Sequence, residues 1–359
     1  MAENTPPRTI FLTGFPGFIA TRLVERLAAN CEQFYLLVQP PFIEKAKMEV
    51  ESIALRTDVP IEKFAIIPGN ITLAGLGIDP EDTAELVETV TEVHHLAAIY
   101  DLAVAREPAF SVNVEGTKNV NGFVRTLKRL SGYNYVSTCY VAGKRIGRIL
   151  ETELEHTAGF RNFYEETKYL AELEVEKLKR DLPVTVFRPS VVVGDSRTGE
   201  TAKYDGIYYL IRYLARAPRV LRLVNVGNKH VKLNLVPVDH VVEAITSLSR
   251  DPDSIGKTFA IADPSPLTTS LLFDVITEAL CGKRSIVSPL ASLVYAFLRS
   301  PPSPSLTGLP HSAVPDFFIE QEYDTALASG FLARHGITCP SFADYVPNIV
   351  DFVKKHPDL

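Results

Sequence analysis

A glycine-rich turn near the N-terminus places the strongest constraint on the fold of this chain. The stretch 13–20 (TGFPGFIA) follows the apolar run 9–12 and precedes a helix-like segment at 21–29. A strand, a glycine turn and a helix N-terminus in this order can seat the pyrophosphate of a dinucleotide. Gly14 can adopt the positive φ of a tight turn, and Gly17 has no side chain to block the phosphate. The turn residues expected to contact it are Gly14, Phe15, Pro16, Gly17, Phe18 and Ile19.

Strand-like and helix-like segments alternate through the first half of the chain. The strand candidates are apolar throughout, which is typical of a parallel sheet covered on both faces. The alternation predicts an α/β fold with a Rossmann-type, doubly wound parallel sheet. We expect strands at 9–13, 34–38, 64–68, 92–96, 133–137, 184–188 and 258–262, and helices at 21–29, 80–90, 112–130, 165–180 and 241–249.

The character of the sequence changes after Gly194. Residues 203–232 are rich in tyrosine and arginine, and prolines and short helices follow from Pro264. A chain of 359 residues can bury a core large enough for two lobes. We therefore expect a nucleotide-binding Rossmann domain from 1–194 and 233–263, and a smaller, discontinuous C-terminal lobe for substrate from 195–232 and 264–359.

Composition excludes several classes of protein. A net charge of −6 argues against general nucleic-acid binding, and no run reaches the roughly 18 apolar residues of a membrane span. Residues 1–8 lack the apolar core of a signal peptide, and the four cysteines are scattered, so we expect a cytoplasmic protein with reduced thiols. His94 and His95 are adjacent but lack further ligands at metal-binding spacing, so no metal site is expected.

Tyr164 and Lys168 lie four residues apart in a helix-like run and therefore share one helical face. A nearby ammonium and an oxidised nicotinamide both favour the phenolate, which brings a phenol into a useful range. Such a pair can protonate a developing alkoxide while hydride arrives from the nicotinamide. Tyr140 and Lys144 have the same spacing, but the nearby Gly143 predicts a turn there.

Hydroxyl groups follow the predicted strand at 133–137. The carboxyl end of a parallel strand faces the crevice where ligands bind, so Thr138 can hydrogen-bond a substrate carbonyl and share its charge with Tyr164. The alternative is that Ser137 and Thr138 only cap a turn.

Together these motifs resemble those of the extended short-chain dehydrogenase/reductase (SDR) superfamily. The resemblance is to the branch with male-sterility-type NAD-binding domains, which includes thioester reductases, the reductase domains of carboxylic acid reductases and fatty acyl-CoA reductases. It covers residues 9–262. The motifs that carry it are TGFPGFIA (13–20), GNIT (69–72), LGI (76–78), HHLAA (94–98), NVEGT (113–117), VSTCYVAG (136–143), YEETK (164–168), FRPSVVVG (187–194) and VPVD (236–239).

The resemblance implies roles for individual residues. Thr138 would orient the carbonyl, Tyr164 would donate the proton, and Lys168 would lower the Tyr164 pKa and hold the nicotinamide ribose. Asn113 would act through its helix, by positioning Lys168 or a water. Further cofactor contacts would come from Gln39, Asn70, Ile71, Leu96, Ala97, Ala98, Val136, Ser137, Pro189, Val191 and Val192.

Three positions depart from the family pattern. Ala20 replaces the last glycine of the turn, and Asn70 replaces an aspartate near the adenine. Gln39 ends the second strand, where an acid would read the ribose of NAD and an arginine the 2′-phosphate of NADP. The resemblance favours NADP(H) and leaves NAD(H) open. Lys45 and Lys47 are near enough in sequence to meet a phosphate, or else form a solvated helix face.

The activity implied is NAD(P)H-dependent hydride transfer to a carbonyl or acyl thioester. With a thioester, the hemithioacetal would collapse to an aldehyde, which a second round would reduce to an alcohol. This chemistry needs no protein nucleophile, so we expect Cys139 to be a buried structural cysteine. Two alternatives stay open: a nucleotide-sugar epimerase or dehydratase, which usually carries an acid where Gln39 stands, and a non-catalytic NADP(H)-binding sensor or scaffold, which commonly loses the tyrosine or lysine.

Two later segments bear on partners. In the segment 203–232, Arg212 and Arg216 share one face of a predicted helix, and Pro218 would end that helix. This basic segment would meet the phosphate of coenzyme A, of an acyl-carrier protein's phosphopantetheine arm or of a nucleotide sugar; the alternatives are an acidic protein partner and a solvated face. The apolar run 289–298 is too short for a span, so we expect it to pack in the small lobe, with a lipid-accepting cleft or a peripheral membrane contact as alternatives.

Overall fold

The computed structural model describes residues 8–216, 224–289, 296, 299–300 and 319–359. The chain divides into two compact units. The first contains Met1–Lys144, Thr152–Arg188 and Val242–Ala260, and the second contains Arg145–Glu151, Pro189–Val241 and Ile261–Leu359. The sequence suggested a different division for four segments. It placed them in the nucleotide-binding domain, whereas the structure groups them with the second unit: 145–151, 189–194, 233–241 and 261–263. The substrate-binding role of the second unit stays a prediction.

A seven-stranded sheet forms the centre of the first unit, in the order β10-β7-β5-β4-β1-β2-β3. The pairings that join β3 through β7 across this order are parallel. The order reverses between β1 and β4, as in a doubly wound Rossmann fold, so the predicted fold class is confirmed. The strands are β1 (Thr9–Thr13), β2 (Gln33–Val38), β3 (Phe64–Pro68), β4 (Glu92–His95), β5 (Gly132–Val136), β7 (Val184–Pro189) and β10 (Thr258–Ile261), each within one residue of its predicted ends.

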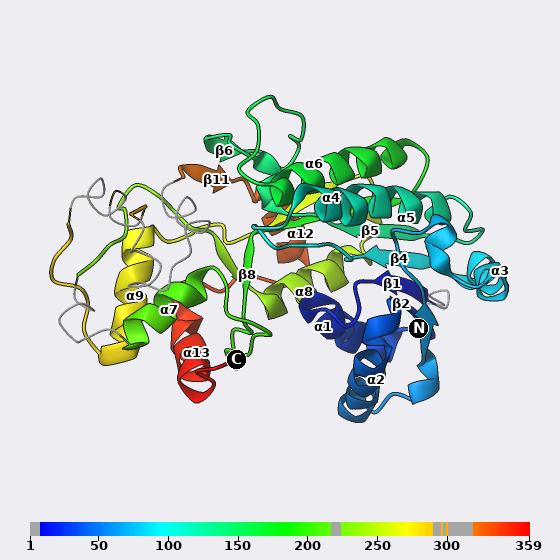
Figure 1. Cartoon of the computed structure of the whole chain (residues 1–359), viewed down its shortest axis with the longest axis horizontal. Coiled ribbons are helices and arrows are strands. Elements are labelled where there is room, and N and C mark those ends of the chain that lie inside the picture. Colours follow the sequence, from blue (N-terminus) through cyan, green and yellow to red (C-terminus); the bar gives the residue numbers. More distant parts are fainter. Residues whose placement is uncertain (1–7, 217–223, 290–295, 297–298, 301–318) are drawn as a thin grey trace. The chain divides into compact units, whose positions relative to one another are not determined.

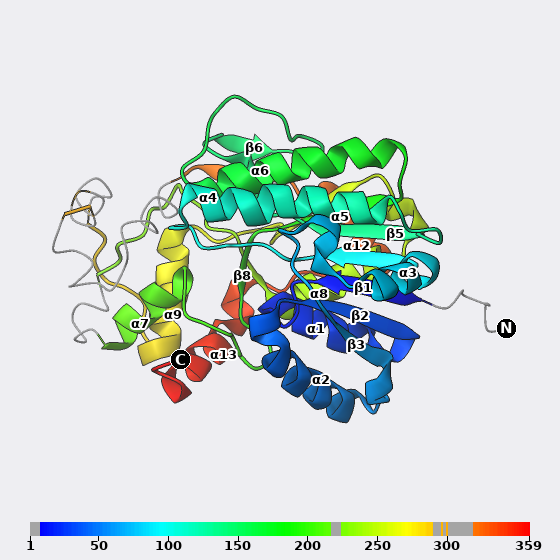
Figure 2. The ribbon, with the colours of Figure 1, turned by 45° about the vertical axis from the view of Figure 1, so that its right-hand side comes forward.

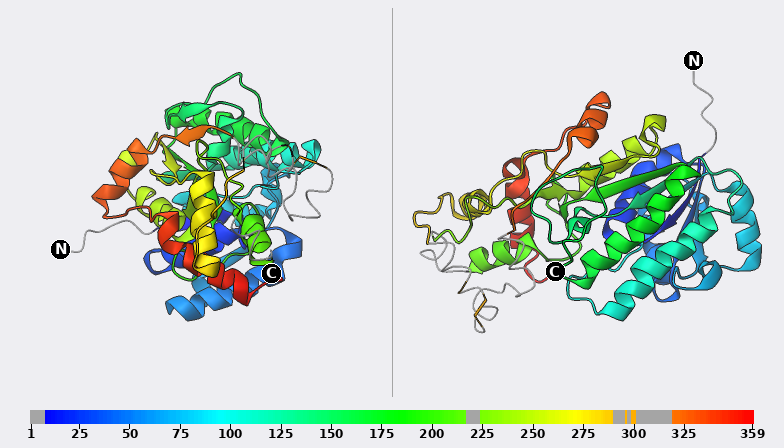
Figure 3. Two further views of the ribbon diagram at one scale, coloured as in Figure 1. Left: turned by 90° about the vertical axis from the view of Figure 1, so that its left-hand side faces the viewer. Right: turned by 90° about the horizontal axis from the view of Figure 1, so that it is seen from above.

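Helices cover both faces of this sheet (Figures 1 and 2). On one face, α5 (Gly116–Val124) and α6 (Phe163–Glu176) run side by side, as the view from above also shows (Figure 3). Their apolar side chains pack with Tyr133 and Tyr135 of β5, and with Leu86 of α3 (Pro80–Thr89). The opposite face carries α1 (Phe18–Leu27) and α2 (Ile43–Thr57). The helix α8 (Val238–Leu248) contributes Glu243, which pairs with Arg26 of α1 at 2.7 Å.

The helix between β4 and β5 differs from the predicted span 112–130. It begins earlier, with α4 (Arg106–Ala109), continues through a π-helical stretch (Phe110–Glu115), and ends with α5 at Val124. The helix stops there because Thr126 donates to the Phe123 carbonyl from both N and Oγ1, and Lys128 N donates to Val87 O at 3.0 Å. Tertiary contacts therefore override the helical tendency of residues 125–130.

The second unit holds two small sheets and several helices. β8 (Val191–Val193) pairs with β9 (Leu235–Pro237), and β6 (Gly147–Ile149) pairs with β11 (Gln321–Tyr323). Three helices share an apolar core (Figures 1 and 2): α7 (Ile207–Arg216), α9 (Thr269–Cys281) and α13 (Phe342–Lys355). A further helix is α12 (Ala326–Arg334), whose Leu327 N donates to the buried Glu151 carboxylate at 2.6 Å.

The predicted helix with Arg212 and Arg216 is α7, whereas Pro218 and most of 289–298 lie outside the described residues. Among the helices that the structure describes, none has the length and hydropathy needed to cross a bilayer.

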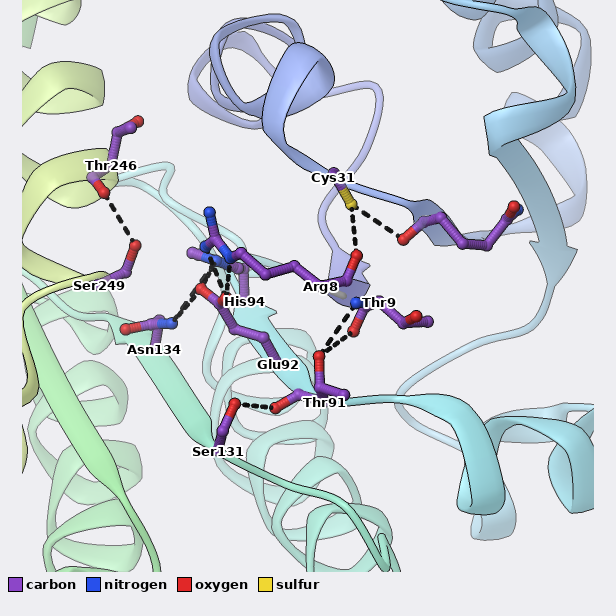
Figure 4. Close-up of polar contacts among 11 residues, drawn as sticks. Arg8, Thr9, Cys31, Thr91, Glu92, His94, Ser131, Asn134, Thr246 and Ser249 are labelled. Atoms are coloured by element: carbon purple, nitrogen blue, oxygen red, sulfur yellow. Dashed lines mark hydrogen bonds and ion pairs between the residues drawn. The ribbon is translucent and has the colours of Figure 1, made fainter. Parts of the chain in front are cut away.

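A buried polar cluster lies at the amino ends of β1, β4 and β5 (Figure 4). Glu92 accepts hydrogen bonds from Arg8 Nε at 2.9 Å, from Asn134 Nδ2 at 3.0 Å, and pairs with His94 Nε2 at 2.6 Å. The carboxyl ends of parallel strands, where ligands bind, are at the opposite edge of the sheet. This cluster therefore has a structural role, and it accounts for the first of the two adjacent histidines.

Candidate active site

The glycine turn after β1 has the geometry that the sequence predicted. Gly14 has a φ of 95°, and Gly17 N donates to Gly14 O at 2.8 Å, which closes the turn. A Cβ at Gly14 would lie 2.8 Å from Ala97 N, and one at Gly17 would lie 2.6 Å from Gly14 O. Both positions therefore require glycine, and the requirement at Gly17 arises from the turn itself as well as from any ligand.

The turn leads directly into α1, for which Gly17 is the N-cap. The cap has no side-chain hydrogen bond, and the first turn carries no acidic residue. The N–H groups of a first helical turn have no partner within the helix and carry partial positive charge, so this end suits a phosphate. Ala20 is only 2% exposed, which shows that its methyl group is accommodated inside the fold.

The segment after β4 packs against the glycine turn. Leu96 N donates to Thr13 O at 3.3 Å, and Ala97 N donates to Thr13 Oγ1 at 3.2 Å. The predicted contacts Leu96, Ala97 and Ala98 thus lie beside Gly14, at the point where the strand order reverses. Thr13 was missed as a contributor because a threonine at a strand end carries no distinctive signal.

Gln39 and Asn70 lie close together beyond β2 and β3. Gln39 Nε2 is 3.5 Å from Asn70 Oδ1, which also accepts hydrogen bonds from Thr72 N and Thr72 Oγ1 at 3.0 Å. The neighbouring Ile71 is buried. The Asn70 side chain therefore stabilises its own loop. Asn70 and Gln39, two of the three departures from the family pattern, contact each other.

Tyr164 lies in the first turn of α6, which Asn162 caps by accepting from Glu165 N at 2.9 Å. Its hydroxyl forms a hydrogen bond with Thr138, directly after β5. Burial raises the pKa of Tyr164 to about 12, and the bond with Thr138 acts in the opposite direction. Thr138 also accepts from Tyr140 N at 3.2 Å, so it both caps a turn and contacts Tyr164. The structure thus brings together Tyr164 and Thr138, the two hydroxyl groups that the sequence predicted to share the charge of a substrate carbonyl.

Tyr140 belongs to the short 3-10 turn Cys139–Ala142, as the nearby glycine predicted. Its ring meets that of Tyr164 edge to face, with centroids 6.4 Å apart. Cys139 is buried, and its thiol donates to Arg188 O at 3.1 Å, which agrees with the expected structural cysteine.

Lys168 is buried one turn along α6 and points into the sheet. Its Nζ donates to the Tyr135 hydroxyl and to Val136 O, both at 2.9 Å. Burial lowers the pKa of Lys168 to about 7, opposed by the charge of Glu172. The sequence suggested that Lys168 would lower the pKa of Tyr164, but the pKa of that phenol is raised, because burial dominates.

Asn113 lies in the π-helical stretch, a feature that is frequent at functional sites. Its Oδ1 accepts from Ile99 N at 2.8 Å, and its Nδ2 donates to Ile99 O at 3.0 Å and to Thr167 Oγ1 at 2.9 Å. Asn113 thus joins the segment after β4 to α6 through Thr167, the residue that precedes Lys168 in the sequence.

A buried ion pair that the sequence did not predict supports this arrangement. Glu172 accepts from Arg188 Nε at 2.8 Å and Nη2 at 2.6 Å, and it also accepts from Ser137 Oγ. The pair ties α6 to the ends of β5 and β7. The sequence carries one indication of this pair. Glu172 stands four residues after Lys168, and this spacing places the two side chains on the same face of a helix.

The remaining predicted contacts belong to the second unit. Pro189 ends β7, and Val191 and Val192 begin β8, so their contact with a cofactor stays a prediction. Among the described residues, no group of three or more His, Cys, Asp or Glu side chains is arranged to hold a metal ion.

Comparison with known proteins identifies the family of the chain. The profile of the family described as "Male sterility protein" matches residues 12–245. Fatty acyl-CoA reductase wat of Drosophila melanogaster is 28% identical over 280 residues, which cover 67% of this chain and 54% of the relative. Glycine betaine reductase ATRR of Emericella nidulans is 26% identical over 294 residues, which cover 75% of this chain and 22% of the relative. The chain therefore spans about half of one relative and about a fifth of the other.

Solved structures show the same fold. The terminal R domain from the myxalamid PKS-NRPS biosynthetic pathway has a TM-score of 0.84 and 25% identity, with 99% of this chain and 92% of that chain covered. The R domain of a non-ribosomal peptide synthetase from Mycobacterium tuberculosis has a TM-score of 0.73 and 19% identity, with 98% and 92% covered. The match over residues 12–245 establishes the family, and the chain belongs to the male sterility protein family, in the thioester-reductase-like branch of the extended SDR superfamily.

Proposed function

We propose that this chain is an NAD(P)H-dependent reductase of acyl thioesters or related carbonyl compounds, with Tyr164 as the general acid. The observation that carries the proposal is the hydrogen bond between Tyr164 and Thr138 at the carboxyl end of β5, with Lys168 one helical turn away. A carbonyl oxygen that accepts from both hydroxyl groups would have its developing charge shared between them.

The residues around the glycine turn fit a dinucleotide. Gly14 and Gly17 allow the tight turn, because a Cβ at either position would meet backbone atoms, and the start of α1 offers backbone N–H groups for a pyrophosphate. Lys168 would hold the nicotinamide ribose, and the segment 96–98 would line the cofactor. The cofactor supplies the hydride, and this chain supplies binding, orientation and the proton.

We infer that the cofactor is NADP(H). Gln39 at the end of β2 has no charge to repel a 2′-phosphate, and Lys45 is exposed in the first turn of α2 nearby. Lys47, in contrast, pairs with Glu44 at 2.8 Å, which leaves Lys45 as the better phosphate contact. Exchange of Lys45 for Gln should weaken NADPH binding and leave NADH binding unchanged.

The proton transfer that we propose follows from the state of Tyr164. With a pKa raised to about 12, the phenol is protonated at neutral pH and can donate to an alkoxide that forms on the substrate. Thr138 keeps the hydroxyl oriented toward the strand end. With a thioester, the resulting hemithioacetal collapses to an aldehyde and a free thiol, and a second reduction gives an alcohol.

The substrate class that we propose is an acyl chain on coenzyme A or on an acyl-carrier protein. Relatives are named fatty acyl-CoA reductases, and similar structures are R domains of peptide synthetases. The free cysteines of the described residues agree with the cytoplasm as the location that we propose.

The test is to mix purified protein with NADPH or NADH and a panel of acyl-CoAs, ketones and nucleotide sugars. Loss of NADPH absorbance with acyl-CoA alone, together with an aldehyde product, supports the proposal. Turnover of a nucleotide sugar without net cofactor oxidation identifies an epimerase or dehydratase, and tight binding without turnover identifies a sensor.

A further inference from the structure

The buried Lys168 donates a hydrogen bond to a side chain of the protein itself, the Tyr135 hydroxyl. An ammonium group has three N–H donors. Two of those of Lys168 are fixed inside the fold, one by the Tyr135 hydroxyl and one by Val136 O, both at 2.9 Å. Lys168 Nζ also lies 4.5 Å from the centroid of the Tyr135 ring. Among the described residues nothing accepts the third donor, so the first two contacts decide where it points.

The Tyr135 hydroxyl is the first member of a buried hydrogen-bonded chain. Tyr135 bonds Thr117 of α5, and Thr117 Oγ1 lies 3.1 Å from His95 Nε2. His95 Nδ1 in turn lies 2.7 Å from Thr13 Oγ1, the atom that accepts from Ala97 N. Each of these side chains is at most 3% exposed, from Thr13 through to Lys168.

The chain supports a continuous direction of donation from Lys168 to Thr13 when the neutral His95 carries its proton on Nδ1. Lys168 donates to Tyr135, Tyr135 to Thr117, Thr117 to His95 Nε2, and His95 Nδ1–H to Thr13. This direction needs a neutral imidazole, and burial together with the charge of Lys168 lowers the pKa of His95 to about 3. The second of the adjacent histidines thus connects the lysine to the glycine turn.

We propose that Tyr135 is a positioning residue that holds the Lys168 ammonium charged and directed at the cofactor, and that Thr117, His95 and Thr13 anchor it to the cofactor-binding turn. The inference rests on the proposed function for the identity of the group that Lys168 meets. It extends the site from α6 across β5 and β4 to β1, on residues that the family motifs do not assign to catalysis.

The charged and titratable groups around Lys168 come from four elements. Its own helix contributes Glu172, whose charge favours the ammonium, and Tyr164. β5 contributes Tyr135 and β4 contributes His95. Arg188 of β7 is bound to Glu172 and offsets part of its charge. Of these groups, Tyr135 is the one that hydrogen-bonds Lys168 directly.

The test compares two substitutions on the same strand. Tyr135→Phe removes the acceptor from Lys168, whereas Tyr133→Phe makes the same chemical change two residues away, at a hydroxyl that donates to Asn121 Oδ1 at 2.8 Å. Both side chains are at most 1% exposed and belong to the same apolar core. Melting temperature identifies any variant that fails to fold, and Thr117→Val, which cuts the chain one link further on, then replaces Tyr135→Phe.

The direct readout is titration of Lys168 in protein labelled with [ε-¹³C]lysine, with the resonance assigned by its loss in Lys168→Arg. We expect a midpoint near 7 in the wild type and in Tyr133→Phe. Tyr135→Phe should lower the midpoint by about one pH unit, because a hydrogen bond to a charged group is lost. An unshifted midpoint, or an equal shift in both variants, overturns the inference.

NADPH binding, followed by its fluorescence, tests the proposed function separately. We expect Tyr135→Phe to weaken NADPH binding about tenfold at mildly alkaline pH, as one unit of pKa implies, and Tyr133→Phe to leave it unchanged. If the lysine midpoint shifts while NADPH binds equally well to both variants, the contact to the cofactor is overturned and the hydrogen-bonded chain stands.

Discussion

The Lys168 ammonium donates to the Tyr135 hydroxyl at 2.9 Å, and both side chains are buried. A lysine in the core costs stability when it carries a charge, because burial removes its hydration. The site therefore keeps a group that the fold alone would not favour, which is a frequent property of functional sites.

The cost of burying Lys168 predicts how stability depends on pH. Its pKa falls from 10.5 in the unfolded chain to about 7 in the folded one. Between these values the unfolded chain binds the extra proton, so the free energy of unfolding rises with pH. Relative to Lys168→Met, the wild type should gain up to about 1.4 kcal/mol per pH unit in this window. Urea unfolding at several pH values measures the difference, and a flat difference would exclude a depressed lysine pKa.

The polar cluster at the other edge of the sheet predicts a dependence of the same sign, but in the acid range (Figure 4). Burial opposes ionisation of Glu92, but His94 and Arg8 outweigh it and hold its pKa below the usual 4.5. This contribution to stability is present above pH 4.5 and is lost as the pH falls through the folded value. Glu92→Gln should cost about 3 kcal/mol near neutral pH, because Arg8 loses its partner inside the fold.

The matched control for Glu92 is an exposed pair. Glu88 and Lys128 form a surface ion pair with both side chains more than half exposed. Glu88→Gln should change the free energy of unfolding by less than about 1 kcal/mol. Equal losses for Glu88→Gln and Glu92→Gln would show that the buried cluster adds no specific stability.

The glycine turn makes a prediction about both stability and binding. Gly14→Ala should cost about 1–3 kcal/mol, because φ is 95° and the added methyl group meets the backbone at Ala97. It should also abolish NADPH binding, measured by fluorescence. Gly122→Ala in α5 is the control: nothing lies within 4 Å of the new Cβ, so it should stabilise the helix by about 0.5–1 kcal/mol and leave binding unchanged. Normal binding by Gly14→Ala would contradict the assignment of the turn.

The sequence predicted the central sheet and the placement of Tyr164 beside Thr138, because these depend on local patterns. Continuous apolar runs located the seven strands, and glycine spacing located the turn. Tyr164 was separated from Tyr140 by the helical run that follows it, and the structure shows Tyr140 in a turn.

What the sequence did not predict depends on contacts between distant residues. The end of the helix at Val124 is set by a bond from Lys128 to Val87. The spacing of Lys168 and Glu172 predicts a shared helical face, but not that Glu172 pairs with Arg188 or that Tyr135 accepts from Lys168, because these partners are set by the fold. The same applies to the pKa of Tyr164: a neighbouring lysine suggested a fall, whereas desolvation gives a rise.

The central claim is tested most directly by Tyr164→Phe with NADPH deuterated at the transferred position and an acyl-CoA substrate. We expect the wild type to place deuterium in the aldehyde product. Tyr164→Phe should bind NADPH within about twofold and lose a factor of about 10²–10⁴ in kcat, the usual contribution of a general acid. Tyr133→Phe should keep the wild-type rate. An unchanged kcat in Tyr164→Phe would contradict the account and move the search for the proton donor to Tyr140.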